Sequence, residues 1–215
     1  MTPDLRVYLV TDPGLGGARP VEHTVAAAVE GGVTIVQLRD KTAGPAALEA
    51  VARRLLAVLQ GTGVPLVVND DVEVARALGL GAHVGGADAA PVDARAALGP
   101  GVPLGVSTYA GRDLLPGEEE ALDYVAVGPV WGTATKPDAG PGIGLEAVTR
   151  AAGRNRLPVV AIGGIDAARA GEAVTAGAAG VAVVSAVMAA ADPRAAARAV
   201  RESVDAALAA REEGR

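Results

Sequence analysis

The side chains best suited to chemistry gather in one stretch rich in glycine and proline, residues 128–144. Within four positions it carries two hydroxyls and an ammonium, from Thr133, Thr135 and Lys136. Glycine and proline at this density prevent a regular helix or strand, so we expect a long loop, and such loops are usually functional. Hydroxyls, an ammonium and exposed backbone amides suit an anion such as phosphate or pyrophosphate. The alternative is a solvated surface loop with a chance lysine.

The two lysines stand out against the rest of the composition. The chain has 19 residues that are Lys or Arg, and only Lys41 and Lys136 are lysine. In such a sequence a lysine suggests that a compact ammonium is wanted, although two chance surface lysines would look the same. Lys41 follows Gln37 and Arg39 at alternate positions. If the strand extends that far, the three side chains point the same way and suit a polyanion; the alternative is a structural ion pair between Arg39 and Asp40.

Short apolar runs alternate with helical patterns and must position these side chains. We expect strands at residues 6–11, 34–38, 65–68, 81–84, 103–106, 124–127, 158–162 and 180–184. Helices are expected at residues 21–30, 46–60, 72–78, 91–98, 118–122, from 145, at 167–176 and at 193–210. Eight such units predict a parallel sheet closed into a single (β/α)8 TIM barrel. A doubly wound sheet is the main competitor, but no Gly-x-Gly-x-x-Gly follows the first strand.

The expected domain is a single one over residues 1–215, with its core at about 6–190. The C-terminal helix is expected at about 193–210, followed by a frayed tail at 211–215. Half of the residues are hydrophobic and 2% are aromatic, so the core must be aliphatic, as in a packed parallel sheet.

Polar or glycine residues follow every strand from the second onward. In a barrel these strand ends share one face, where active sites form. Singly, each could be a turn residue or a helix cap; together they predict a site. Gly163-Gly164 and Val184-Ser185, at the ends of strands seven and eight, match the common phosphate site of such barrels. The whole set is Gln37, Arg39, Lys41, Asn69, Asp70, Asp88, Ser107, Thr133, Thr135, Lys136, Gly163, Gly164, Val184 and Ser185.

Two carboxylates, Asp70 and Asp88, follow neighbouring strands. Beside a phosphate-bearing ligand they suit Mg²⁺, which prefers oxygen ligands and keeps several waters. A proton-transferring carboxylate pair is the alternative, and Asp70 could instead cap the next helix, a role that Asp71 fits better. We interpret His83, inside a strand, as a core histidine with satisfied hydrogen bonds. Trp131 could line a pocket or plug the barrel rim.

Composition argues against several classes of function. A net charge of −6 without a basic cluster gives no footprint for nucleic acid. The chain has no cysteine, hence no disulfide and no thiolate metal site. No apolar run reaches membrane-spanning length. We therefore expect a cytoplasmic protein that handles small phosphorylated molecules, and the sequence leaves its oligomeric state open.

At this point several motifs together resemble the thiamine-phosphate synthase family, from about Tyr8 to Met188. The motifs are Tyr8-Leu9-Val10-Thr11-Asp12, Val36-Gln37-Leu38-Arg39-Asp40-Lys41, Val68-Asn69-Asp70-Asp71-Val72, Gly128-Pro129 with Thr133-x-Thr135-Lys136, Ala161-Ile162-Gly163-Gly164-Ile165 and Val183-Val184-Ser185-Ala186. The family couples 4-amino-2-methyl-5-hydroxymethylpyrimidine pyrophosphate to 4-methyl-5-(2-hydroxyethyl)thiazole phosphate, or its carboxylated form. The products are thiamine phosphate and pyrophosphate.

The resemblance implies a role for each matched residue. The pyrimidine pyrophosphate would be held by Gln37, Arg39, Lys41, Asn69, Ser107 and Lys136, of which Arg39, Lys41, Ser107 and Lys136 would be catalytic. The thiazole phosphate would be held by Thr133, Thr135, Gly164, Val184 and Ser185. Asp70 and Asp88 would bind Mg²⁺. The implied mechanism is dissociative: pyrophosphate leaves first, and the thiazole nitrogen captures the pyrimidine-methyl cation, so no general base is needed.

Two departures and two rival functions stay open. The family usually has Gly-Gln-Glu-Asp where this chain has Gly85-Gly86-Ala87-Asp88, which puts nearby pyrimidine or water contacts in doubt. Trp131-Gly132 stands where the family often has another aromatic followed by proline. One rival is a thiazole tautomerase, an isomerase on the same fold that lacks the full pyrophosphate and metal set. The other is a noncatalytic barrel that binds a phosphorylated ligand.

Overall fold

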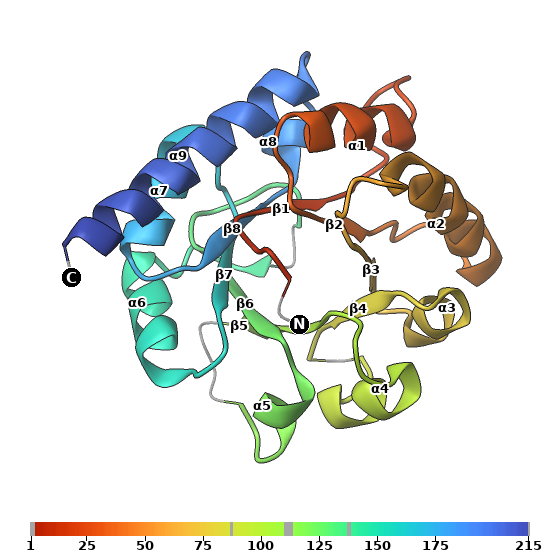
Figure 1. The fold of residues 1–215 in the computed structure, drawn as a ribbon, viewed down its shortest axis with the longest axis horizontal. Coiled ribbons are helices and arrows are strands. Elements are labelled where there is room, and N and C mark those ends of the chain that lie inside the picture. The colour runs from red at the N-terminus through yellow and green to blue at the C-terminus, as the bar shows by residue number, and fades with distance from the viewer. Residues whose placement is uncertain (1–2, 87, 110–113, 137–138, 215) are drawn as a thin grey trace.

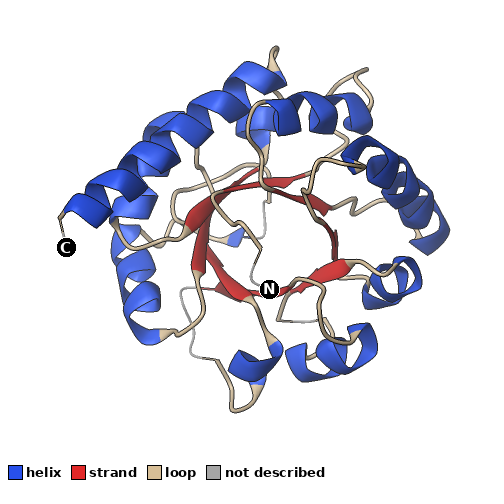
Figure 2. Ribbon diagram, in the orientation of Figure 1, coloured by secondary structure: helices blue, strands red, loops and turns tan. Residues whose placement is uncertain are grey.

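The eight strands form a closed parallel barrel in chain order, with β8 paired back to β1. The computed structural model describes residues 3–86, 88–109, 114–136 and 139–214. Figure 2 shows the ring of strands inside a ring of helices. The strands are β1 (Val7–Val10), β2 (Ile35–Leu38), β3 (Leu66–Asn69), β4 (Gly81–Val84), β5 (Leu104–Tyr109), β6 (Tyr124–Gly128), β7 (Val159–Ile162) and β8 (Gly180–Val183). The expected TIM barrel is confirmed.

Helices follow the strands around the outside of the barrel (Figure 1). They are α1 (Val21–Glu30), α2 (Pro45–Leu59), α3 (Val72–Leu78), α4 (Pro91–Leu98), α5 (Glu118–Ala121), α6 (Leu145–Arg154), α7 (Ala167–Thr175), α8 (Ser185–Met188) and α9 (Pro193–Glu213). The four-residue helix α8, directly after β8, was not expected. No helix in the described ranges is long and apolar enough to cross a membrane.

Helix α9 corrects the expected C-terminal boundary. It continues to Glu213, past the expected end at residue 210. Arg211, assigned to a frayed tail, instead donates hydrogen bonds to the carbonyls of Val174 and Ala178, at 3.1 and 3.0 Å. Val174 lies in the last turn of α7, where a cation is favoured, and Ala178 lies in the connection from α7 to β8. The contact fixes the last turns of α9 against the barrel.

Alternate residues of each strand face opposite sides of the barrel wall. Val7 and Leu9 of β1 belong to the cluster shared with the helices, whereas Tyr8 and Val10 belong to the cluster inside the barrel. Tyr124 of β6 also points inward, and Gly105 makes room for it. A Cβ atom at Gly105 would lie 2.1 Å from the Tyr124 ring. The interior is therefore filled mainly by aliphatic side chains and two tyrosines, together with the buried polar side chains of Gln37 and His83.

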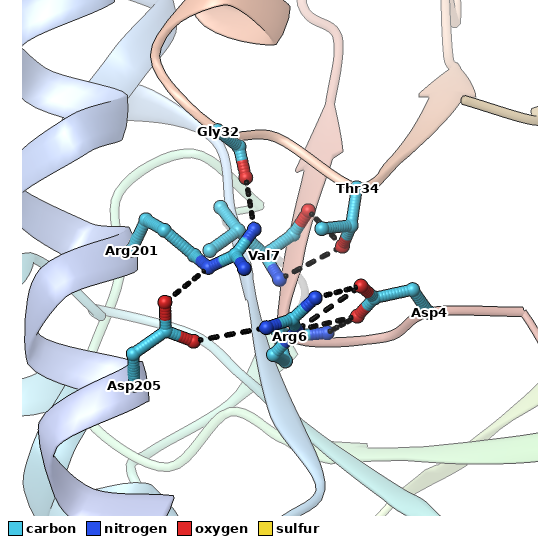
Figure 3. Close-up of polar contacts among 7 residues, drawn as sticks. All are labelled: Asp4, Arg6, Val7, Gly32, Thr34, Arg201 and Asp205. Carbon is cyan, nitrogen blue, oxygen red and sulfur yellow. Dashed lines mark hydrogen bonds and ion pairs between the residues drawn. The ribbon is translucent and has the colours of Figure 1, made fainter. Parts of the chain in front are cut away.

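Charged side chains fasten α9 to the start of β1, as Figure 3 shows. Asp205 accepts from Arg201 at 2.6 Å and from Arg6 at 3.3 Å. Arg201 also donates to the carbonyl of Gly32 at 3.3 Å, and its aliphatic stem packs against that glycine. Thr34 bonds both the amide and the carbonyl of Val7, each at 3.1 Å. The last helix is thus tied to both strands at the beginning of the barrel.

This cluster gives a first prediction about stability. Arg201→Ala should lower the free energy of unfolding by about 1 kcal/mol, because it removes a half-buried ion pair together with the packing of the arginine stem. Chemical denaturation measures the change. Arg150→Ala is the matched control, since Arg150 also pairs with a carboxylate four residues away, Glu146, but that carboxylate is 95% exposed. Equal losses in the two variants would contradict the prediction.

Candidate active site

One cavity of about 650 Å³ opens at the C-terminal ends of the strands. Every residue to which the sequence analysis assigned a substrate or metal role lines it. These are Gln37, Arg39, Lys41, Asn69, Asp70, Asp88, Ser107, Thr133, Thr135, Lys136, Gly164, Val184 and Ser185. They come from the ends of seven different strands, so the barrel brings together positions far apart in the chain. The structure gives their place; their individual roles stay predictions.

Arg39 lies beyond the end of β2 and is held there by Thr11. The fully buried Thr11 hydroxyl accepts from the amide of Arg39 at 2.9 Å and donates to its carbonyl at 3.1 Å. The guanidinium pairs with Asp12 at 3.4 Å, so the alternative ion pair with Asp40 is not formed. Asp40 instead accepts hydrogen bonds from Thr42, at 2.9 Å from the amide and 2.7 Å from the hydroxyl. Arg39 therefore reaches the cavity from a fixed backbone.

Lys41 reaches across to Asp70 at the end of β3. Its ammonium forms a short ion pair with one carboxylate oxygen of Asp70, and the side-chain amide of Asn69 bonds the other oxygen. Asp70 has a φ of 64°, a left-handed conformation that turns its side chain over the strand end. The cap of α3 is Asp71, which accepts from the amide of Val74 at 2.9 Å. Asp70 is thus free of the capping role, as expected.

Asp70 and Asp88 form the acidic part of the cavity. Burial, followed by the direct interaction with Asp88, raises the pKa of Asp70 above its usual value, against the opposing effect of Lys41. Asp88 accepts from the amide of Gly85 at 2.7 Å, which fixes its position. Two facing carboxylates that resist simultaneous ionisation suit a divalent cation.

The remaining surroundings of this acidic pair are limited. Within the described ranges no group of three or more His, Cys, Asp or Glu side chains gathers to hold a metal. A cation at Asp70 and Asp88 would therefore take its other ligands from water or from a phosphorylated ligand, as Mg²⁺ does. The departure from the family at Gly86-Ala87 falls partly on Ala87, which lies outside the described residues.

The glycine-rich stretch is a long loop between β6 and α6, as predicted. Backbone hydrogen bonds close it at its base: the amide of Ile143 donates to Pro129 at 2.8 Å, and that of Gly144 donates to Val130 at 3.0 Å. The amide of Val130 then bonds the carbonyl of Ile162 at 2.8 Å. The base of the loop is thereby attached to β7, and Thr133, Thr135 and Lys136 line the cavity wall.

Trp131 and Arg169 hold the loop after β7 in place. The guanidinium of Arg169 lies 5.3 Å from the centre of the Trp131 ring and donates to the carbonyl of Gly164 at 2.7 Å. Gly163 and Gly164 have φ values of 102° and 64°, and neither has room for a Cβ. Because a trans peptide points its N–H opposite to its C=O, the amide of Ile165 faces away from Arg169. Trp131 therefore supports, through Arg169, the backbone at Gly164 and Ile165, whose amides suit a phosphate.

Five side chains form one continuous chain of hydrogen bonds at the cavity floor, and all of them except Tyr124 line the cavity. Gln37 donates to the hydroxyl of Tyr8 at 2.8 Å, and that hydroxyl lies 2.8 Å from the hydroxyl of Tyr124. Tyr124 bonds Nδ1 of His83 at 3.0 Å, and Nε2 of His83 bonds Ser107 at 2.9 Å. Burial lowers the pKa of His83 to about 4. His83 is buried with both nitrogens satisfied, as predicted, yet it also lines the cavity.

Sequence reasoning missed the roles of Tyr8 and Tyr124, the two tyrosines in this hydrogen-bonded chain. A signal was available, because the sequence has three tyrosines and no phenylalanine. In such a chain a tyrosine inside an apolar strand indicates that its hydroxyl has a partner. Their inward direction depends on register, in which Tyr124 lies opposite Gly105. Short strands of four to six residues leave that register unfixed until the barrel closes.

The cavity brings together two sets of groups whose chemistry suits anions. Cations and carboxylates from β2, β3 and β4 line one side. On the other side are the hydroxyls of the β6 loop and the backbone after β7 and β8. Among the described residues that line the cavity, no imidazole is placed to act as a free base, since both nitrogens of His83 are engaged. The arrangement favours electrostatic stabilisation of a leaving anion over proton transfer.

Comparisons with known proteins agree with this geometry. A thiamine-phosphate synthase from Xanthobacter autotrophicus is 49% identical over 205 residues, covering 95% of this chain and 97% of the relative. One from Azorhizobium caulinodans is 44% identical over 203 residues, covering 94% and 96%. A solved thiamine phosphate pyrophosphorylase from Pyrococcus furiosus superposes with a TM-score of 0.86 at 33% identity, covering 96% and 98%.

The family profile described as "Thiamine monophosphate synthase" matches residues 7–187, which include every strand and all of the cavity residues named above. Family match, close relatives and solved structure thus point the same way. The chain belongs to the thiamine monophosphate synthase family.

Proposed function

We propose that the cavity couples a pyrimidine pyrophosphate to a thiazole phosphate, giving thiamine phosphate and pyrophosphate, with the residue roles set out below. The substrates are 4-amino-2-methyl-5-hydroxymethylpyrimidine pyrophosphate and 4-methyl-5-(2-hydroxyethyl)thiazole phosphate or its carboxylated form. The single observation that supports these roles is the convergence of both anion-binding sets on one cavity. Two substrates bound side by side react as an effectively unimolecular pair.

The pyrophosphate end lies against β2, β3 and the loop after β6. Arg39, Lys41 and Lys136 supply positive charge there, and Gln37, Asn69 and Ser107 supply hydrogen bonds to the pyrimidine pyrophosphate. As the carbon–oxygen bond breaks, negative charge grows on the departing diphosphate. Fixed cations stabilise that charge more than they stabilise the bound substrate, so they lower the barrier.

Asp70 and Asp88 would hold Mg²⁺ in this arrangement. A bound Mg²⁺ would neutralise charge on the pyrophosphate oxygens. Support comes from the two facing carboxylates, whose mutual repulsion and burial raise the pKa of Asp70. Lys41, paired with Asp70, would then exchange that contact for the pyrophosphate once the substrate arrives.

The chemistry that follows requires no general base. Departure of pyrophosphate leaves a pyrimidine-methyl cation, which the electron-rich aminopyrimidine ring stabilises. The thiazole nitrogen then captures this cation through its lone pair. The engagement of both nitrogens of His83 fits this dissociative course. The floor of the cavity is otherwise apolar, from residues such as Val10, Ala126 and Ile162. Such a floor keeps water from competing for the cation.

A coupling assay on the purified chain tests the proposal. The chain, both substrates and Mg²⁺ should yield thiamine phosphate by mass spectrometry and one pyrophosphate per product. Thiazole isomerisation without pyrophosphate release would indicate the tautomerase instead, and tight binding without turnover would indicate a binding protein. Neither alternative is favoured by the family assignment. We propose the cytoplasm as the location, since charged phosphorylated substrates do not cross a bilayer unaided.

The thiazole phosphate end gives a further prediction. Thr133, Thr135, Gly164, Val184 and Ser185 would hold the phosphate, and Arg169 fixes Gly164 from behind. Arg169→Gln should raise the KM for thiazole phosphate about fivefold to tenfold, because it removes a cation–π contact and a charged hydrogen bond that orient the loop.

Steady-state kinetics with each substrate varied in turn make this measurement. The KM for the pyrimidine pyrophosphate should stay at its wild-type value. Arg150→Gln, on the neighbouring helix α6, is the matched control and should change neither constant. If both KM values rose together in Arg169→Gln, the residue would serve the whole barrel and not this loop.

A further inference from the structure

The hydrogen-bonded chain on the cavity floor joins two residues that the proposed function assigns to the pyrimidine substrate, Gln37 and Ser107. Tyr8, Tyr124 and His83 connect them without a gap. Tyr8, Tyr124 and His83 are buried, with exposed fractions of 1%, 0% and 6%. With no room for bulk water, each group must satisfy its neighbour, so the five side chains act as a unit.

The direction of the chain follows from counting protons. Gln37 donates its amide to Tyr8, so the single proton of Tyr8 goes on to Tyr124. The proton of Tyr124 then goes to Nδ1 of His83. The imidazole is buried and faces hydroxyls at both nitrogens, not a carboxylate, so it is neutral and carries its proton on Nε2. Nε2–H donates to Ser107, whose own proton is left for a ligand.

The opposite direction is the only other consistent arrangement of a neutral chain. If the Gln37 amide were turned over, Tyr8 would donate to its carbonyl, and every later bond would reverse. Gln37 would then offer an NH₂ group to the cavity, and Ser107 would offer a lone pair. The hydrogen-bonding characters of Gln37 and Ser107 are therefore linked through His83, although the two residues lie 70 positions apart.

We propose that His83 is a positioning residue for the coupling reaction, which joins Gln37 and Ser107 through Tyr124 and Tyr8 and fixes what each offers: a carbonyl from Gln37 and a hydroxyl proton from Ser107. This inference rests on the proposed function. The ligand that fits has an N–H donor toward Gln37 and an acceptor toward Ser107. An aminopyrimidine that bears a pyrophosphate has both.

The same linkage makes the site selective. A pyrimidine with an oxo group in place of the amine would set a carbonyl against the carbonyl of Gln37. Turning the Gln37 amide to avoid this would reverse the whole chain and withdraw the proton of Ser107. Binding of the oxo analogue thus disturbs the hydrogen bonds of five groups. The free-energy cost is therefore larger than a single glutamine could impose.

The tautomer of His83 is the first test, and it needs no variant and no activity. The sequence has two histidines, His23 and His83, so ¹⁵N-histidine labelling gives two imidazole spin systems. His23→Gln assigns them. We expect His83 in the Nε2–H form at neutral pH. The Nδ1–H form or an imidazolium would overturn the proposal, whether or not the chain makes thiamine phosphate.

Tyr124→Phe is the second test, because it interrupts the chain at a hydroxyl outside the cavity lining while keeping the ring. It should lower kcat/KM for the aminopyrimidine pyrophosphate by at least about tenfold, because it removes two buried hydrogen bonds, to Tyr8 and to His83. It should also lower the ratio of kcat/KM for the aminopyrimidine substrate to kcat/KM for the oxo analogue. The KM for thiazole phosphate should stay unchanged. In the ¹⁵N spectrum, His83 should become a mixture of tautomers.

Thr34→Val is the matched control, since it removes a hydroxyl with two hydrogen bonds just before β2, at the other end of the barrel. It should alter neither the preference nor the spectrum of His83. An unchanged preference and tautomer in Tyr124→Phe would overturn the proposal. The wild-type protein could form no product while His83 still held the Nε2–H form. In that case the proposed function would fail, and the direction of the hydrogen bonds from Gln37 to Ser107 would stand.

Discussion

Lys136→Ala is expected to lower kcat by about a hundredfold to a thousandfold, the usual effect of removing one group that stabilises developing negative charge. Lys136 lies in the loop between β6 and α6 and lines the cavity, and the proposed function assigns it to the pyrophosphate. Its ammonium helps most after the carbon–oxygen bond has begun to break. The loss should therefore appear in kcat, while the KM for the pyrimidine pyrophosphate changes little.

Single-turnover measurements of pyrophosphate formation in quenched samples isolate the chemical step, because they exclude slow product departure. Lys136→Arg is the informative partner: it keeps the charge but replaces a compact ammonium with a planar fork, so it should recover part of the rate. A large rise in KM with an unchanged kcat would mean that Lys136 only helps to bind the substrate. The choice of lysine in a chain that otherwise uses arginine would then lack a catalytic reason.

Much of this site could be predicted from the sequence, because its residues directly follow apolar strands. The bounds of α1, α3, α4 and β4 came out as expected, since proline, glycine or a capping aspartate marks them. Once eight strands close into a barrel, every strand end lies on one face, whatever the details of packing. The convergence on one cavity needed only that rule.

What the sequence did not reveal depends on contacts between distant elements. Lys41 and Arg39 reach the cavity although β2 ends at Leu38, because the hydroxyl of Thr11 holds the chain beyond the strand. Strand alternation alone does not predict such a clamp. The extension of α9 to Glu213 likewise depends on carbonyls at the end of α7. Local propensity contains neither fact, so both appeared only with the fold.

Asp70→Asn should remove the response of the protein to Mg²⁺. In the wild-type chain, Mg²⁺ with inorganic pyrophosphate should raise the melting temperature, since a ligand that binds only the folded state stabilises it. In Asp70→Asn that rise should vanish. The coupling rate should fall by about a hundredfold or more, because loss of a metal ligand costs at least as much activity as loss of a residue that hydrogen-bonds to such a ligand. Asp88→Asn should act in the same direction.

Without Mg²⁺, the Asp70→Asn variant should be at least as stable as the wild-type protein. Burial and Asp88 raise the pKa of Asp70 above its usual 3.8, so the folded state holds this proton more firmly than the unfolded state. The wild-type fold therefore loses stability as the pH rises through the raised pKa. The Asp70→Asn variant has an uncharged amide in place of this carboxylate. It should therefore lack this pH dependence and melt at or above the wild-type temperature at neutral pH.

Asp71→Asn is the matched control, one residue along the chain. Asp71 caps α3, and asparagine is an equally good cap. This variant should keep the Mg²⁺-dependent rise, the coupling rate and the pH dependence of the wild-type chain. If Asp70→Asn kept its Mg²⁺ response as well, Asp70 would be no ligand. The carboxylate pair would then serve to orient Lys41, which the removal of Mg²⁺ would leave unaffected.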